Sequence, residues 1–300
     1  MFRGCGTALV TPFRSDLSID EAALRRLLRR QIEAGINFLV PCGTTGESPT
    51  LSHEEHLRVV RITIEEAGGK TPVLAGAGGY NTAEVIALAN ELEAMGADGI
   101  LSVTPYYNKP TQEGLIQHYQ AIAAAVKLPI IVYSVQGRTG VNVEPGTLER
   151  LAQISNIVGV KEASGSITQI GAVLQRVPEG FTVLSGDDSL TLPLMALGGH
   201  GIISVASNEI PAAMTALAQA GLRGDFAAAR ALHRQWLPLM DMNFLESNPI
   251  PVKAAMALMG LLEPVWRLPM TPPRPDTQSR IRQILEASGI RPARSSHAAD

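Results

Sequence analysis

A single lysine, Lys161, stands at the end of an apolar run and is suited to nucleophilic chemistry. The run, residues 156–160, has the composition of a strand that is buried on both faces. In parallel α/β folds the carboxyl ends of the strands surround the active site, so Lys161 would lie there. Burial eases deprotonation of an ammonium, and a free amine attacks carbonyl groups to form a Schiff base. The alternative is a lysine that ends a strand and points to water.

Two adjacent threonines follow another apolar run and predict a binding loop. Thr44 and Thr45 lie between glycines in residues 43–48. Small residues let a ligand approach the backbone, and free N–H groups ahead of a helix suit an anion such as a carboxylate. A plain turn with a helix cap would need only one hydroxyl, so the pair favours a functional loop.

Further polar side chains follow the next predicted strands. Tyr133 ends one of them, and its hydroxyl could move a proton to and from the carbinolamine that precedes a Schiff base. Arg138 lies between glycines soon afterwards, where a guanidinium could hold a carboxylate through two parallel hydrogen bonds. Tyr106 and Tyr107 are adjacent in another loop. A buried structural tyrosine, a solvated arginine and interface aromatics are the competing interpretations.

Two other groups of titratable residues favour structural interpretations. We interpret Asp187 and Asp188 as helix-capping residues, because aspartates favour helix N-termini. His53 and His56 are three residues apart and share one face of a predicted helix. The zinc signature has its histidines four apart, and two cysteines alone cannot build a zinc site, so we predict no metal. An effector site or a solvated helix surface remains for the histidines.

Eight short apolar runs alternate with amphipathic stretches, and this pattern predicts an α/β fold, a (β/α)8 TIM barrel with a C-terminal helical domain. A doubly wound sheet is the alternative, but it would need a glycine fingerprint after the first strand. The glycines at 76–79 follow the third strand instead and lack the third glycine of that motif. We expect a catalytic barrel over residues 1–222, a helical domain over 223–290 and a disordered tail over 291–300.

Composition excludes several classes of protein. The formal net charge of -3 gives no basic field for nucleic acid, and no apolar run approaches the about 20 residues of a membrane helix. The N-terminus lacks the pattern of a signal peptide, and the only cysteines, Cys5 and Cys42, fit a reducing compartment. We therefore expect a cytoplasmic protein without nucleic-acid or membrane partners.

Several longer motifs together resemble the dihydrodipicolinate synthase and N-acetylneuraminate lyase superfamily over about residues 4–270. They are GTTGE at 43–47, VTPYYNKP at 103–110, GRTG at 137–140, GVKEASG at 159–165, SGDD at 185–188, ALGGHGIISV at 196–205 and ESNPIPVKAA at 246–255.

The resemblance implies a lyase that condenses pyruvate with L-aspartate 4-semialdehyde in lysine and diaminopimelate biosynthesis, with no metal or organic cofactor. It implies that Lys161 forms the Schiff base and that Tyr133, Thr44 and a neighbouring subunit's Tyr107 relay protons. The implied substrate-binding residues are Thr45, Arg138, Gly186 and Ile203. Another pyruvate-dependent aldolase, such as N-acetylneuraminate lyase, and a non-catalytic barrel that binds 2-keto acids are the alternatives.

The resemblance also implies a homotetramer, a dimer of dimers, and L-lysine as an effector near the dimer interface. The implied effector residues are Ser48, His53, His56, Tyr80, Glu84 and Tyr106. The chain departs from the family pattern at Pro49 and Tyr80, where small or amide residues are expected. Ahead of Arg138 the family commonly has the run tyrosine–asparagine–valine–proline, whereas this chain has Ser134 and Gln136 in place of the asparagine and the proline. Without the proline, the loop has more conformational freedom in the unfolded chain.

Overall fold

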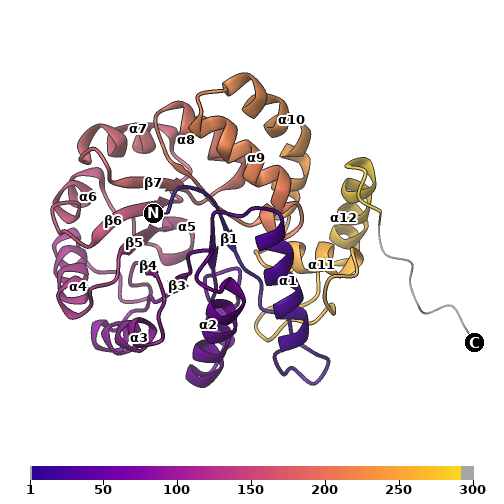
Figure 1. Cartoon of the computed structure of the whole chain (residues 1–300), viewed down its shortest axis with the longest axis horizontal. Coiled ribbons are helices and arrows are strands. Elements are labelled where there is room, and N and C mark those ends of the chain that lie inside the picture. The colour runs from indigo at the N-terminus through magenta and orange to yellow at the C-terminus, as the bar shows by residue number, and fades with distance from the viewer. Residues whose placement is uncertain (1, 292–300) are drawn as a thin grey trace, which may run out of the picture.

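The computed structural model describes residues 2–291 and shows a barrel of eight parallel strands surrounded by helices (Figure 1). The strands run in the order β2-β1-β8-β7-β6-β5-β4-β3, and a parallel bridge between Leu39 and Val73 joins the two ends of this order. The predicted TIM barrel is therefore confirmed. The strands are β1 (Gly4–Ala8), β2 (Phe38–Val40), β3 (Leu74–Gly76), β4 (Gly99–Val103), β5 (Ile130–Ser134), β6 (Ile157–Glu162), β7 (Thr182–Ser185) and β8 (Gly201–Ser204).

Helices follow every strand and pack outside the barrel, except for one single-turn helix, which lies at the mouth of the barrel (Figure 1). The helices are α1 (Glu21–Glu33), α2 (His53–Ala67), α3 (Thr82–Ala94), α4 (Gln112–Ala125), the one-turn α5 (Gln136–Thr139), α6 (Pro145–Leu151), α7 (Ile167–Arg176), α8 (Thr191–Ala196) and α9 (Pro211–Leu222). Three 3-10 turns lie at Ser48–Thr50, Asp188–Leu190 and Ala206–Asn208. Asp20 caps α1, because its carboxylate accepts the N–H of Ala23.

Strand alternation divides the apolar residues between two packed layers. In β5, Ile131 and Tyr133 point into the barrel, whereas Ile130 and Val132 pack against the outer helices. The inner layer also holds Leu184 of β7 and Ile203 of β8. Tyr133 and Ile203, both predicted site residues, therefore share the barrel interior.

A C-terminal helical region follows the barrel. It consists of α10 (Phe226–Met242), α11 (Ile250–Leu258) and α12 (Pro275–Ala287), and α12 packs against both α10 and α11. Figure 1 places α11 and α12 outside the ring, on the side of α1. Within residues 2–291, no helix combines the length and the apolar character that crossing a membrane demands. The expected disordered tail falls on residues 292–300, apart from Arg291, and so lies outside the described residues.

Candidate active site

Lys161 and Tyr133 face one another at the carboxyl ends of β6 and β5. The two residues are paired in the parallel register, and the Lys161 Nζ lies 4.3 Å from the centroid of the Tyr133 ring. Both side chains are buried, at 5% and 6% exposure. The alternative of a lysine that points to water is therefore wrong. The amine and the aromatic ring are therefore held together at the carboxyl ends of two neighbouring strands.

The loop after β2 holds Thr44 and Thr45 in a tight turn. The N–H groups of Gly46 and Glu47 donate to the carbonyls of Gly43 and Thr44. A Cβ at Gly46 would lie only 3.1 Å from the Leu9 carbonyl oxygen, so the turn packs directly on the backbone after β1. Glu47 adopts left-handed backbone angles, with φ 53° and ψ 34°, which is uncommon for a residue other than glycine. The loop is thus a specific, tightly held conformation.

Arg138 lies on the one-turn helix α5 rather than on the irregular loop that its glycine neighbours suggest. Backbone N–H groups of Arg138 and Thr139 donate to the Val135 carbonyl, and this closes the turn despite the absence of proline. The Arg138 guanidinium donates to the main-chain carbonyl of Asn248 at 3.2 Å. The remaining donors of the guanidinium are exposed beside the cavity.

Gly186 and the aspartates after it close the site at β7. A Cβ at Gly186 would lie 2.4 Å from the Ala163 Cβ, so only glycine fits this approach of the two strands. The helix-capping interpretation is wrong for both aspartates. The Asp187 side chain caps no helix, and Asp188 accepts instead from the N–H groups of Val205 and Ala206 after β8. Here, a carboxylate that stabilises the end of another strand, that of Asp188, resembles a cap in sequence.

Burial raises the pKa of the Asp187 carboxyl, whereas the positive charges of Lys161 and Arg138 act in the opposite direction. Asp187 therefore lies in the electric field of the site's two cations. The position of Asp187 in the sequence, directly after Gly186, is equally compatible with a helix cap and with a place in the site.

A cavity of about 350 Å³ opens at this end of the barrel. The predicted chemical residues Thr44, Tyr133 and Arg138 line it. Its wall continues past the 3-10 turn after Glu47 to three predicted effector residues, Ser48, His56 and Tyr106. In the single chain, the two predicted sites therefore share one hollow.

The two histidines do not meet in that hollow. The His56 Nε2 is 2.9 Å from the Gly76 carbonyl oxygen, and burial lowers the pKa of His56 below its ordinary value. His53 is exposed and its Nε2 lies 3.1 Å from a carboxylate oxygen of Glu91. One helix face holds both residues, but His56 faces the main-chain carbonyl of Gly76 whereas His53 faces the Glu91 carboxylate. In the described part of the chain, no cluster of three or more His, Cys, Asp or Glu is arranged to hold a metal.

The remaining predicted residues lie at the rim. Tyr107 is 92% exposed and has a positive φ of 65°, so its side chain is not packed against the rest of this chain. Tyr80 packs edge-on against Tyr106, with ring centroids 5.2 Å apart. Glu84 is exposed and accepts from Asn81. These three residues occupy an open surface beside the cavity.

Asn248 is a site residue that the sequence reasoning missed. Its side-chain Nδ2 donates to the Thr45 Oγ1 at 2.9 Å, while its carbonyl accepts from Arg138. Asn248 thus connects the threonine loop with the arginine, from a region about 110 residues beyond Arg138. The only signal in the sequence is its place in the 246–255 motif, to which no role was attached.

The matching family model is the dihydrodipicolinate synthetase family, over residues 1–288. A relative from Koribacter versatilis, named 4-hydroxy-tetrahydrodipicolinate synthase, is 56% identical over 96% of this chain and 96% of its own. A protein of the same name from Nitratidesulfovibrio vulgaris is 53% identical over 96% of this chain and 99% of its own.

Solved structures of the same kind superpose on nearly the whole chain. The chloride-inhibited dihydrodipicolinate synthase from Acinetobacter baumannii, complexed with pyruvate, is 44% identical with a TM-score of 0.95 and covers 97% of this chain and 100% of its own. DHDPS from Cyanidioschyzon merolae with lysine bound is 38% identical, with a TM-score of 0.92 over 96% and 99%. A monomeric dihydrodipicolinate synthase variant is 45% identical, with a TM-score of 0.94 over 96% and 97%.

Proposed function

The chain belongs to the dihydrodipicolinate synthetase family, and from this premise we propose how its residues condense pyruvate with L-aspartate 4-semialdehyde. The observation that carries the proposal is the buried pair of Lys161 and Tyr133, with Nζ 4.3 Å from the ring centroid. An amine and a phenol held together at the carboxyl end of a barrel are what imine chemistry requires.

The first stage joins pyruvate to the protein. The unprotonated Lys161 amine attacks the keto carbon of pyruvate and gives a carbinolamine. Proton transfer to its hydroxyl, through Tyr133, expels one water and leaves the imine. Thr44 passes protons between Tyr133 and Tyr107 of a neighbouring subunit, and the exposure of Tyr107 in the single chain leaves it accessible to such a neighbour. Loss of a methyl proton then turns the imine into an enamine.

The second stage forms the ring. The enamine carbon attacks the aldehyde carbon of L-aspartate 4-semialdehyde, and the aldehyde oxygen takes up a proton. The substrate amine next attacks the imine carbon and expels the Lys161 amine, which closes the ring of 4-hydroxy-tetrahydrodipicolinate. The water lost at imine formation is the only molecule released, and the lysine is regenerated.

The surrounding residues hold the two substrates. Backbone groups at Thr45 and Ile203, together with Gly186, receive pyruvate. Arg138 holds the carboxylate of the semialdehyde, because its guanidinium lies at the cavity with donors still exposed. The relative from Acinetobacter baumannii, solved with pyruvate, supports the assignment of the first substrate.

The test is to trap the imine. Borohydride added with saturating pyruvate should attach a stable mass to the protein, and peptide mapping should place it at Lys161. Lys161→Ala should abolish the label, whereas Lys127→Ala, a substitution in the loop after α4, should retain it. Unlabelled wild-type protein would refute the Schiff-base mechanism and would favour a non-catalytic binding barrel.

The aldehyde is tested separately. Turnover with pyruvate and L-aspartate 4-semialdehyde, with N-acetylneuraminate as the control substrate, distinguishes this activity from that of the sialic acid aldolases. Cleavage of N-acetylneuraminate without turnover of the semialdehyde would assign the chain to the alternative branch.

We also propose that L-lysine binds in the outer part of the cavity and inhibits. Ser48, His56 and Tyr106 line this part, and Tyr80 and Glu84 lie beside it. The relative from Cyanidioschyzon merolae, solved with lysine bound, supports the choice of ligand. His53 contributes less directly, because its imidazole is already paired with the Glu91 carboxylate. Millimolar lysine should lower turnover at saturating pyruvate, and His56→Ala should weaken that inhibition while uninhibited turnover is nearly unchanged. Flat activity with no heat of binding would contradict the proposal.

A further inference from the structure

A buried ion pair fixes the threonine loop from the far end of the chain. The Lys253 Nζ, on α11, lies 2.5 Å from the Glu47 Oε1, and their side chains are 0% and 1% exposed. The second oxygen, Oε2, accepts from the backbone N–H of Arg267 at 3.3 Å. Glu47 is therefore bound through both carboxylate oxygens by residues that lie beyond the barrel.

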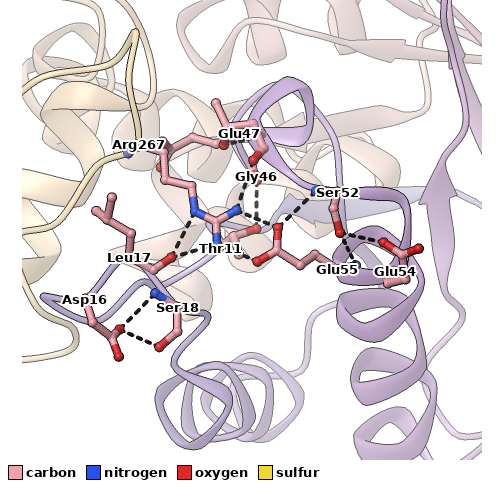
Figure 2. A network of polar contacts seen from close by, with 11 residues as sticks. Thr11, Asp16, Leu17, Ser18, Gly46, Glu47, Ser52, Glu54, Glu55 and Arg267 are labelled. Carbon is pink, nitrogen blue, oxygen red and sulfur yellow. Dashed lines mark hydrogen bonds and ion pairs between the residues drawn. The ribbon is translucent and has the colours of Figure 1, made fainter.

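The same region anchors itself to the barrel through Arg267 (Figure 2). Its guanidinium donates to both carboxylate oxygens of Glu55, at 2.6 and 2.5 Å, and to the carbonyls of Thr50 and Leu17. Lys253 and Arg267 also lie over the ring of Phe13, at 4.4 and 4.3 Å from its centroid. The two residues that bind Glu47 are thus themselves held in place by contacts with the barrel and the segments next to it.

Glu47, the residue anchored in this way, is only two or three positions from Thr45 and Thr44. Glu47 directly follows Gly46, whose carbonyl accepts from Thr11 Oγ1 at 2.7 Å, and the Glu47 N–H donates to the Thr44 carbonyl at 3.1 Å. The side chain of Thr45 is held by Asn248, five residues ahead of Lys253. One C-terminal segment therefore holds both sides of the Thr44–Thr45 turn.

A gain in folding stability does not account for a buried ion pair of this kind. Removing two charges from water costs several kcal/mol per ion, and an apolar replacement is often neutral or stabilising. Glu47 in addition occupies left-handed backbone angles that disfavour an L-residue. The chain thus retains a costly arrangement at a turn that lines the cavity.

We propose that Glu47 and Lys253 are positioning residues that hold the Thr44 hydroxyl and the Thr45 backbone in register with Lys161. The inference rests on the proposed function, because it assigns these two threonines to proton transfer and pyruvate binding. Neither Glu47 nor Lys253 lines the cavity, so the pair acts through the turn and not on the substrates.

The experiment compares variants of the full chain. Glu47→Gln keeps the shape of the side chain and removes its charge. Glu47→Asp keeps the charge but shortens the reach. The double variant Glu47→Gln/Lys253→Met removes both charges and so avoids an unpaired buried ammonium. Glu113→Gln breaks the exposed ion pair with Arg150 and serves as the control. Thermal unfolding, kcat, KM for pyruvate and the final borohydride label at Lys161 are measured for each variant.

We expect the folded Glu47→Gln and double variants to lose about 10- to 100-fold in kcat while still reaching the wild-type label at Lys161. Glu47→Asp should lose less kcat than Glu47→Gln, and Glu113→Gln should match the wild type. The double variant should unfold near the wild-type temperature, which separates positioning from stability.

Wild-type kcat in either charge-removing variant, measured below its unfolding temperature, would overturn the inference and leave the pair a purely structural feature. Failure of the wild-type protein to label at Lys161 would instead refute the proposed function, so the two failures are distinguishable.

Discussion

At the scale of single residues, the site depends on neighbours that control charge. Lys161 is buried beside an aromatic ring and lies in the field of the partly buried Asp187 carboxyl. The charge of Arg138 also acts on the Asp187 carboxyl. An anionic substrate entering the cavity therefore meets the Arg138 guanidinium, whose charge the Asp187 carboxyl partly offsets.

Arg138→Ala should lower kcat/KM for L-aspartate 4-semialdehyde by about 10- to 150-fold, because a charge-assisted hydrogen bond contributes about 1.5–3 kcal/mol. The KM for pyruvate should change far less, since Arg138 is assigned to the other substrate. Steady-state kinetics with each substrate varied in turn measures the two effects. Arg176→Ala, which breaks an exposed ion pair with Glu149, is the control. An equal loss for both substrates would make the role of Arg138 structural.

A second residue-scale prediction concerns His118 on α4. Burial lowers the pKa of His118 from its ordinary value of 6.5 to about 4, and its Nδ1 lies 2.9 Å from Thr82 Oγ1. As the pH falls from about 6.5 toward 4, the unfolded chain binds a proton that the folded chain does not. The free energy of unfolding should therefore fall across this window, by on the order of 1–3 kcal/mol from this group.

The measurement is urea unfolding of the wild type and of His118→Gln at about pH 7.5 and about pH 5. The variant should lose less stability between the two conditions, and the difference isolates His118 from the other histidines. Parallel losses in both proteins would show that His118 does not govern this dependence.

At the scale of elements, loops that are held at both ends position the side chains of the site. The capping box at the start of α2 is one such device. The Ser52 Oγ accepts the Glu55 N–H, and the Glu55 carboxylate accepts the Ser52 N–H in return. Glu55 also binds Arg267, so the same residue starts the helix of His56 and anchors the C-terminal region.

Ser52→Ala should lower the free energy of unfolding by about 0.5–2 kcal/mol, because it removes the cap of α2 and leaves a helix N–H without its partner. Chemical denaturation measures the change. Ser279→Ala in α12 is the control, since that hydroxyl only bonds back to the Pro275 carbonyl inside a helix and should matter little. A loss of equal size in both variants would argue against a specific capping effect.

At the scale of the whole molecule, Tyr107 and the outer part of the cavity are not covered by other parts of this chain. A proton relay through Tyr107 needs a second subunit to cover that side. The homotetramer built from two tight dimers therefore remains a prediction, and a monomeric relative shows that the fold alone does not impose it. Two-fold dimers are the usual unit of such tetramers.

Light scattering at assay concentrations should give the mass of a tetramer, and dilution should yield dimers before monomers. Tyr107→Phe should retain the assembly and lose turnover, because the substitution removes only the hydroxyl of the relay. A fully active monomer would contradict both the assembly and the contribution of Tyr107 across the interface.

The barrel and the family could be predicted from the sequence alone, and so could the position of Lys161 at the end of a buried strand. Alternating apolar runs require buried parallel strands and covering helices, and this requirement holds whatever the details of packing. Local chemistry also sufficed for the caps at Asp20 and Ser52, because capping involves residues only three positions apart. The family followed from motifs that are contiguous in the chain, such as residues 159–165.

Contacts between distant residues could not be predicted from the sequence and depend on the tertiary structure. Asn248 reaches Thr45 across 203 positions, and Lys253 reaches Glu47 across 206. Asp188 stabilises the end of β8 although it looks like a helix cap, and His53 turns to Glu91 although it shares a helix face with His56. Residue type and spacing specify what a side chain can bind within its own element. Which partner it binds depends on how elements that are far apart in the sequence pack together, and a local sequence pattern carries no information about that packing.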